Sequence, residues 1–209
     1  MAPLPFIFRN TTEVPLRPKI KYNYQDPEAV EKLSKAFIQH LQKLNPDFKQ
    51  PFVVINIGTD RSTGDCLGPL VGNYLSKIKK LPFAVFGTLD DPVHASNLTE
   101  KIALIKSLYP DPFIIAVDAC LGKSENVGCI TLAQGALRPG AGVNKNLPEV
   151  GDIHFTGIVN VGGYMEYFVL QNTRLSIVMR MAQQISEVIY QGLSHIYKYE
   201  QTNIAQGIQ

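Results

Sequence analysis

Three short runs of apolar residues, many of them β-branched or aromatic, recur along this chain, and the first two each lead into a polar loop and then a helical pattern. The runs cover residues 52–57, 83–88 and 113–117. Continuous apolar runs of this length are typical of strands buried on both faces of a largely parallel sheet, because helices cover both sides of such a sheet. The repeated order of strand, loop and helix therefore predicts an α/β fold.

Apolar residues at helical spacing mark the segments between and after these runs. We expect helices near residues 26–45, 67–78, 98–108 and 172–196. The first begins with Asp26 and Pro27, a good N-cap residue followed by a residue suited to the first helical turn. Further strands are expected at 127–132 and 153–161. With helices on both faces of one sheet, this order predicts a three-layer α/β/α sandwich.

The chain divides by composition into three parts. Residues 1–24 are expected to be an arm that is loose or laid over the surface, because their prolines break helices and cannot donate to a strand ladder. These prolines are Pro3, Pro5, Pro15 and Pro18. The apolar stretch Phe6-Ile7-Phe8 could dock on its own domain or on a second copy. Residues 25–199 are expected to form a single α/β domain, and residues 200–209 a polar, disordered tail.

Composition also narrows the classes of partner. Lys and Arg number 20 and Asp and Glu number 18, a net charge of +2 at pH 7, so charge indicates no nucleic-acid partner. No apolar run approaches the roughly 20 residues of a membrane span, and the first residues lack the pattern of a secretory signal. Three cysteines, an odd number, favour reduced thiols. We therefore expect a cytoplasmic protein with no membrane partner.

Candidate site residues follow the ends of the expected strands. Ligands of open α/β sheets bind outside the carboxyl ends of the strands, which pools residues that are distant in sequence. Asp65 closes the loop after the first run, Asp91 and His94 follow the second, and Asp118 directly ends the third. A charge at the end of an apolar run costs desolvation energy unless it is paired or useful. Asp65 alone could equally be a helix cap.

Taken together, Asp65 and Asp118 suggest a carboxylate pair. Two carboxylates held close together do not easily both ionise, so one keeps its proton. The charged one can activate a water molecule while the protonated one donates to a carbonyl oxygen or leaving group, which is the chemistry of amide hydrolysis. The same two residues with His94 or His154 could instead hold a divalent metal. Spacing does not choose between these alternatives.

For the other motifs we expect ordinary structural roles. The loop 58–64 follows a strand but matches neither common phosphate-binding pattern. Cys66 and Cys120 flank the two aspartates, and a cysteine nucleophile paired with His94 is an alternative, although small buried thiols are more common. We expect Tyr164, Tyr167 and Phe168 to lie in the hydrophobic core.

Several segments resemble the YyaC family of sporulation proteins. They are GTDRSTGDCLGPLVG, GTLDDPVHASNL, IIAVDACLG, RPGAGVNKNLPEVGDI and GIVNVGGYMEYFVLQNTRL, and the resemblance covers residues 25–197. That family is similar to the germination protease, an atypical aspartic peptidase, whose catalytic motifs match Asp65 in GDCLGP and Asp118 in AVDA. Its glycine-rich loop matches PGAGVN, which contains Asn144. It is also similar to the hydrogenase maturation endopeptidases, although the sequence around His154 does not match the metal-binding histidine of that group.

The resemblance implies a phosphorylase/hydrolase-like fold with a mixed, mostly parallel five-stranded sheet in which one strand is antiparallel. It implies a peptidase with Asp65 and Asp118 as catalytic residues, supported by His94, Asp91 and Asn144. The substrate would be a sporulation protein, and the location the forespore or spore. No cofactor is expected, although a divalent metal held by Asp65, Asp118 and His94 stays open, as does a homo-oligomer. The alternatives are a non-enzymatic sporulation factor that binds a protein partner and a metal-dependent endopeptidase of the maturation type.

Overall fold

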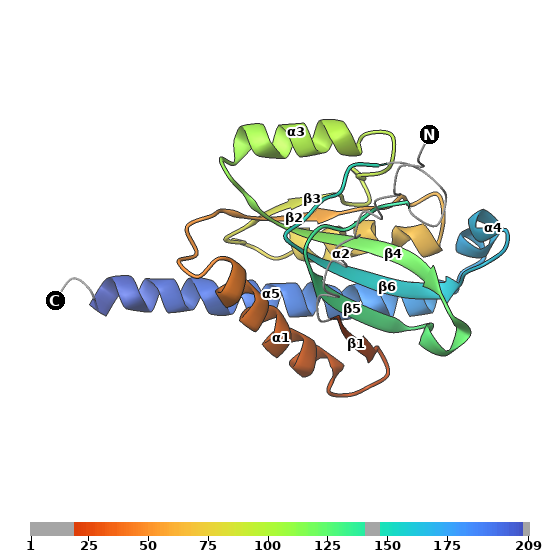
Figure 1. Ribbon diagram of the computed structural model, residues 1–209, viewed down its shortest axis with the longest axis horizontal. Helices are drawn as coiled ribbons and strands as arrows, with labels where there is room; N and C mark the ends of the chain where they lie inside the picture. The colour runs from red at the N-terminus through yellow and green to blue at the C-terminus, as the bar shows by residue number, and fades with distance from the viewer. Residues whose placement is uncertain (1–18, 141–146, 207–209) are drawn as a thin grey trace, which may run out of the picture.

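The computed structural model describes residues 19–140 and 147–206, with side chains described as far as Lys198 (Figure 1). The order of elements is β1 (Ile20–Asn23), α1 (Ala29–Leu44), β2 (Phe52–Asn56), η1 (Gly64–Cys66), α2 (Leu67–Ser76), β3 (Ala84–Phe86), α3 (Leu98–Leu108), β4 (Phe113–Gly122), η2 (Ser124–Asn126), β5 (Cys129–Gln134), β6 (Ile153–Val161), α4 (Glu166–Gln171) and α5 (Leu175–Gln206), where η marks a 3₁₀ helix.

One mixed sheet organises the molecule, with the strand order β1-β5-β6-β4-β2-β3. Strands β3, β2, β4 and β6 are parallel to one another, and β5 is antiparallel to β6. Strand β1 is antiparallel to β5, so it runs with the majority. The predicted mixed, mostly parallel sheet with one antiparallel strand is confirmed, and β1 makes it six strands rather than five.

Strand β1 also corrects the boundary of the expected arm. Ile20 pairs with Leu132 and Asn23 with Cys129, so the last residues of the segment 1–24 belong to the sheet. Ile20 and Tyr22 pack against the main core, and this burial outweighs the local proline signal that suggested a loose arm. Phe6-Ile7-Phe8 lies outside the described residues.

Two hydrophobic cores lie on the two sides of the sheet. The larger packs α1, α2 and α5 against one face, with Leu33, Leu67 and Ile185 among its fully buried members. The smaller packs α3 against β2 and the first half of β4 through Leu98 and Ile105. Figure 1 shows α3 on one side of the sheet and α5 running along the other. The predicted three-layer α/β/α sandwich is confirmed.

The C-terminal part differs from the predicted single helix at 172–196. It forms the short helix α4 and, after a break, the long helix α5. Thr173 lies in the break, buried, and its Oγ1 donates a hydrogen bond of 2.8 Å to the Val169 carbonyl. Helix α5 continues to Gln206, so the prediction of a disordered tail is wrong for residues 200–206. Between Gly192, which lies within the helix, and Gly207, the sequence has no Gly or Pro that would end it.

The aromatic residues of this region are not core residues as predicted. Tyr164, Tyr167 and Phe168 are 85%, 62% and 53% exposed. Tyr164 lies in the turn before α4, and Tyr167 and Phe168 lie in α4, a short helix beyond the end of β6. Among the described residues, none of the helices is long and apolar enough to cross a membrane.

Candidate functional site

Close contact between α2 and the end of β2 positions Asp65. A Cβ atom on Gly68 of α2 would overlap the Ile57 carbonyl oxygen, and one on Gly58 would overlap the carbonyl oxygen of Asp65. Gly58 also has φ +143°, a conformation that suits glycine. The Thr59 N–H donates to the Asp65 carbonyl over 3.1 Å. The glycines therefore let the helix approach the sheet and hold Asp65, in η1, at the carboxyl edge of β2.

Asp118 occupies the middle of a strand rather than its end. Strand β4 continues to Gly122, because its outer half pairs with β6 as far as Val161, with an irregularity between Cys120 and Leu121. Asp118 is in register with Thr156 and is only 8% exposed. On its other side β2 has ended, and the Ile57 N–H donates to the Val117 carbonyl over 2.7 Å. Asp118 thus lies beside the point where the chain turns into the loop that carries Asp65.

The electrostatics of Asp118 favour its protonated form. Burial raises the pKa of the Asp118 carboxyl group well above its ordinary value, and the nearby Asp65 carboxylate raises it further. A hydrogen bond of 2.8 Å from the Ala119 N–H to Asp118 Oδ1 acts in the opposite direction but is the weaker effect. The two aspartates predicted to form a pair therefore interact electrostatically, with Asp118 as the proton-holding member.

A short polar chain lies on the same side of the sheet as Asp118. Thr131 of β5 and Thr156 of β6 are buried and share a hydrogen bond between their hydroxyl groups. The Thr156 side chain also interacts with the Cys120 thiol. These threonines were not expected from the sequence, because β-branched Thr is common in strands and only the pairing register places them next to Asp118.

The cysteine alternative is not favoured by the thiols. Burial raises the pKa of Cys120, and the effect exceeds the opposing hydrogen bond from Thr156. Burial also raises the pKa of Cys66, with Asp60 and Asp65 adding to the shift. A nucleophilic cysteine needs a lowered pKa, because the thiolate is the reactive form. Both thiols are free and remain in the protonated form.

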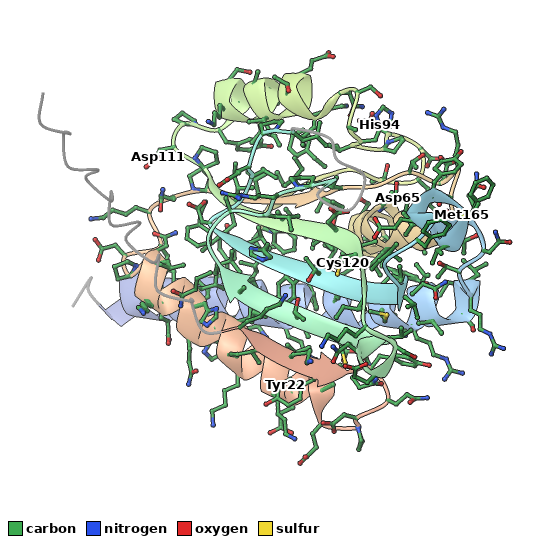
Figure 2. All side chains as sticks on the ribbon, turned by 45° about the vertical axis from the view of Figure 1, so that its right-hand side comes forward. Tyr22, Asp65, His94, Asp111, Cys120 and Met165 are labelled. Carbon is green, nitrogen blue, oxygen red and sulfur yellow. The ribbon has the colours of Figure 1, made fainter. Side chains whose placement is uncertain are left out.

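The residues expected to support the pair, His94 and Asp91, make side-chain contacts of their own. His94 lies on the same side of the molecule as Asp65 (Figure 2), but its Nδ1 is 3.2 Å from the Ser96 hydroxyl. The Asp91 carboxylate forms a surface ion pair with Lys101 at 2.7 Å. Asn144 and most of the PGAGVN loop lie outside the described residues.

The metal alternative requires several ligand side chains to lie close together. Among the described residues, no three His, Cys, Asp or Glu side chains gather closely enough to hold an ion, so Asp65, Asp118 and His94 do not form a metal site. His154 is engaged elsewhere: its Nδ1 lies 2.8 Å from the Gly135 carbonyl oxygen, and burial lowers its pKa. We therefore derive no step through a metal.

Fold and site together define a three-layer α/β protein with an interacting carboxylate pair at the carboxyl edge of its sheet. Residues 21–188 match the family described as "Protein of unknown function (DUF1256)", and the chain belongs to that family. It is 60% identical over 138 residues to the "Uncharacterized protein YyaC" of Bacillus subtilis (strain 168), covering 66% of this chain and 67% of that protein. The resemblance to the YyaC family is thereby confirmed.

A solved structure with a similar chain path is the NiFe hydrogenase maturation protease HycI from Thermococcus kodakarensis KOD1. The TM-score is 0.48 and the identity 20%, over 73% of this chain and 99% of that chain.

Proposed function

We propose that this protein is a peptidase that hydrolyses peptide bonds with the Asp65–Asp118 pair. The observation that carries the proposal is the raised pKa of Asp118, a carboxyl group buried within a strand beside a second carboxylate. Carboxyl groups perturbed by both burial and a like charge concentrate at functional sites. In this arrangement the protonated Asp118 is the general acid and the charged Asp65 is the general base.

In the proposed reaction, Asp65 accepts a proton from a water molecule while the water oxygen bonds to the carbonyl carbon of the peptide. Asp118 gives its proton to the carbonyl oxygen, which produces a tetrahedral diol. When the C–N bond breaks, the nitrogen receives the proton held by Asp65, and Asp118 recovers a proton from one diol hydroxyl. One water is consumed, a carboxyl and an amino terminus are released, and both aspartates return to their starting state.

The finer form of the proposal is a peptidase of the germination-protease type that acts in the cytoplasm of the forespore or spore. Its substrate would be a protein made during sporulation. The observation that supports it is the pair of motifs GDCLGP and AVDA, which carry Asp65 and Asp118. His94 and Asn144 are proposed as supporting residues, and Asp91 as a surface residue that holds Lys101.

The second candidate function is that of a sporulation factor that binds a protein partner without cleaving it. The observation that favours it is the exposure of Tyr164, Tyr167 and Phe168. The two functions differ in their dependence on the aspartates. A binding factor would support sporulation with Asp65→Asn and Asp118→Asn as well as with the wild-type chain, whereas a peptidase would not.

The direct test is cleavage of a peptide mixture prepared from sporulating Bacillus subtilis cells, read as new termini by mass spectrometry. We expect new termini with the wild-type chain. With either Asp65→Asn or Asp118→Asn the cleavage rate should fall by about 100-fold or more, since a general acid or base contributes a factor of roughly 10²–10⁴ to the rate. Asp111→Asn is the matched control, because Asp111 lies on the opposite side of the molecule (Figure 2). Equal product from all four proteins, or none from the wild type with or without divalent ions, would contradict the proposal.

A further inference from the structure

The turn before α4 and α4 itself expose a concentration of large apolar side chains. Five side chains within residues 161–168 are each at least 42% exposed, and we call them the α4 patch: Val161, Tyr164, Met165, Tyr167 and Phe168. The rings of Tyr167 and Phe168 pack edge to face, with centroids 5.9 Å apart. Apolar surface gathered in this way marks interaction sites, whereas isolated exposed apolar residues need no explanation.

The patch rests on a firmly held platform. Asn160, near the end of β6, donates from Nδ2 to the Val169 carbonyl over 3.3 Å and to Thr173 Oγ1 over 3.2 Å. The Glu166 carboxylate, the charge nearest in sequence, accepts a hydrogen bond of 3.2 Å from the Gly163 N–H. The helix is therefore tied to the sheet through its backbone, and the carboxylate is engaged with the turn.

The turn leading into α4 holds Met165 in an unfavourable backbone conformation. Met165 has φ 50° and ψ 44°, in the left-handed region, which costs roughly 1–2 kcal/mol for a residue that is not glycine. Its side chain is nonetheless 56% exposed, so it gains little burial in return. Backbone strain of this kind persists most often at functional sites, where the surrounding structure imposes it.

Helix α4 packs against η1, the element that carries Asp65. A Cβ atom on Gly64, the residue before Asp65, would lie 2.8 Å from Leu170 Cδ2 of α4, so α4 packs directly on η1. The outer halves of β4 and β6 run from Asp118 to the turn before α4, and the Gly162 N–H donates to the Gly122 carbonyl over 2.8 Å. Figure 2 shows Met165 and Asp65 on the same side of the molecule.

We propose that the α4 patch docks a segment of the polypeptide substrate that is rich in large apolar side chains. The inference rests on the proposed peptidase function and names the substrate class for the same site. A polypeptide whose scissile peptide bond lies at the Asp65–Asp118 pair extends beyond the pair in both directions. The α4 patch lies at the end of β4 and β6, the strands that lead away from Asp118. Because none of the five side chains is charged, the complementary segment is apolar, and aromatic anchors suit such contacts.

The test measures binding separately from cleavage. The full-length Asp118→Asn protein is applied to an array of synthetic peptides that differ only in whether large apolar residues or serines occupy alternate positions. We expect the apolar peptides to bind at least about tenfold more strongly than the serine peptides. Adding Tyr167→Ser and Phe168→Ser should remove about tenfold of that binding. The matched control is Leu104→Ser with Leu108→Ser, two residues on α3 that are 42% and 56% exposed.

Each outcome of the binding experiment either supports or overturns the inference. Loss of binding with the α4 variant and not with the α3 variant supports the inference, even if no peptide is ever cleaved, in which case only the peptidase function fails. Equal binding of apolar and serine peptides overturns it. So does a wild-type dimer that the α4 variant converts to a monomer in light scattering, because the occupant is then a second copy. A tenfold rise in peptide binding on Phe6→Ser with Phe8→Ser assigns the patch to the N-terminal segment and also overturns it.

Discussion

The raised pKa of Asp118 makes a specific prediction about the pH dependence of stability. Between the pKa of an Asp in the unfolded chain, about 3.9, and the raised pKa in the folded protein, the folded state holds one proton more than the unfolded state. The free energy of unfolding must then fall as pH rises, by up to about 1.4 kcal/mol per pH unit for one proton. The contribution of Asp118 is most favourable below the unfolded pKa and is lost as pH rises toward the folded pKa.

The perturbation that isolates this contribution is Asp118→Asn, which keeps the shape of the side chain and removes the titration. The difference in unfolding free energy, wild type minus variant, is expected to decline with a slope approaching 1.4 kcal/mol per pH unit above about pH 4. Contributions from other titrating groups cancel in the difference to first order. Asp65→Asn, which removes the neighbouring charge that helps raise the pKa of Asp118, should make the same decline end at a lower pH.

The assay is urea denaturation at a series of pH values. Far-UV circular dichroism is the suitable signal because the chain contains no tryptophan. The midpoints convert to free energies by linear extrapolation, and Asp111→Asn, a substitution of the same kind away from the pair, serves as the control. A wild-type minus Asp118→Asn difference that is flat, or that rises with pH, would refute the reasoning, because it would mean that Asp118 ionises as readily in the folded protein as in the unfolded chain.

Two further predictions concern the packing around the pair. Gly68→Ala should lower the free energy of unfolding by about 1–3 kcal/mol, because the new methyl group overlaps the Ile57 carbonyl; urea denaturation that shows no loss would mean that α2 can retreat from the sheet. Thr131→Val should cost about 1–3 kcal/mol by removing the hydrogen bond between the buried Thr131 and Thr156 hydroxyl groups. Thr131→Val with Thr156→Val should recover part of that loss, since replacing both partners is less costly; a double variant less stable than the single one would contradict this account.

The carboxyl edge of the sheet illustrates what a rule drawn from sequence can supply. Asp65 and Asp118 were predicted together because the carboxyl ends of parallel strands meet at one edge of a sheet, and in the structure the Asp65 carboxylate helps raise the pKa of Asp118. Asp91 and His94 followed from the same rule but lie in contacts of their own, with Lys101 and with Ser96. The rule identifies the edge of the sheet, and it does not say which side chains on that edge turn toward one another.

Local signals were sufficient for the class of fold. Continuous apolar runs, helical repeats, caps and helix-breaking residues reflect interactions among near neighbours. These interactions determine which segments become strands and helices. The expected strand at 153–161 coincides with β6 (Ile153–Val161), and the expected helix at 98–108 with α3 (Leu98–Leu108). The sequence by itself therefore determined the α/β class and the order of most elements.

Only the tertiary structure decided what depends on pairing between distant segments. Strand β4 passes Asp118 because β6 pairs with its outer half, and the segment 20–23 becomes a strand because β5 offers it an edge. The same pairing buries Asp118 and so raises the pKa of its carboxyl group, an effect that no neighbouring residue in the sequence imposes. Tyr164, Tyr167 and Phe168 remain exposed because α4 lies beyond the end of β6. Burial and pKa values arise from contacts across the whole chain, which is why residue patterns along it did not reveal them.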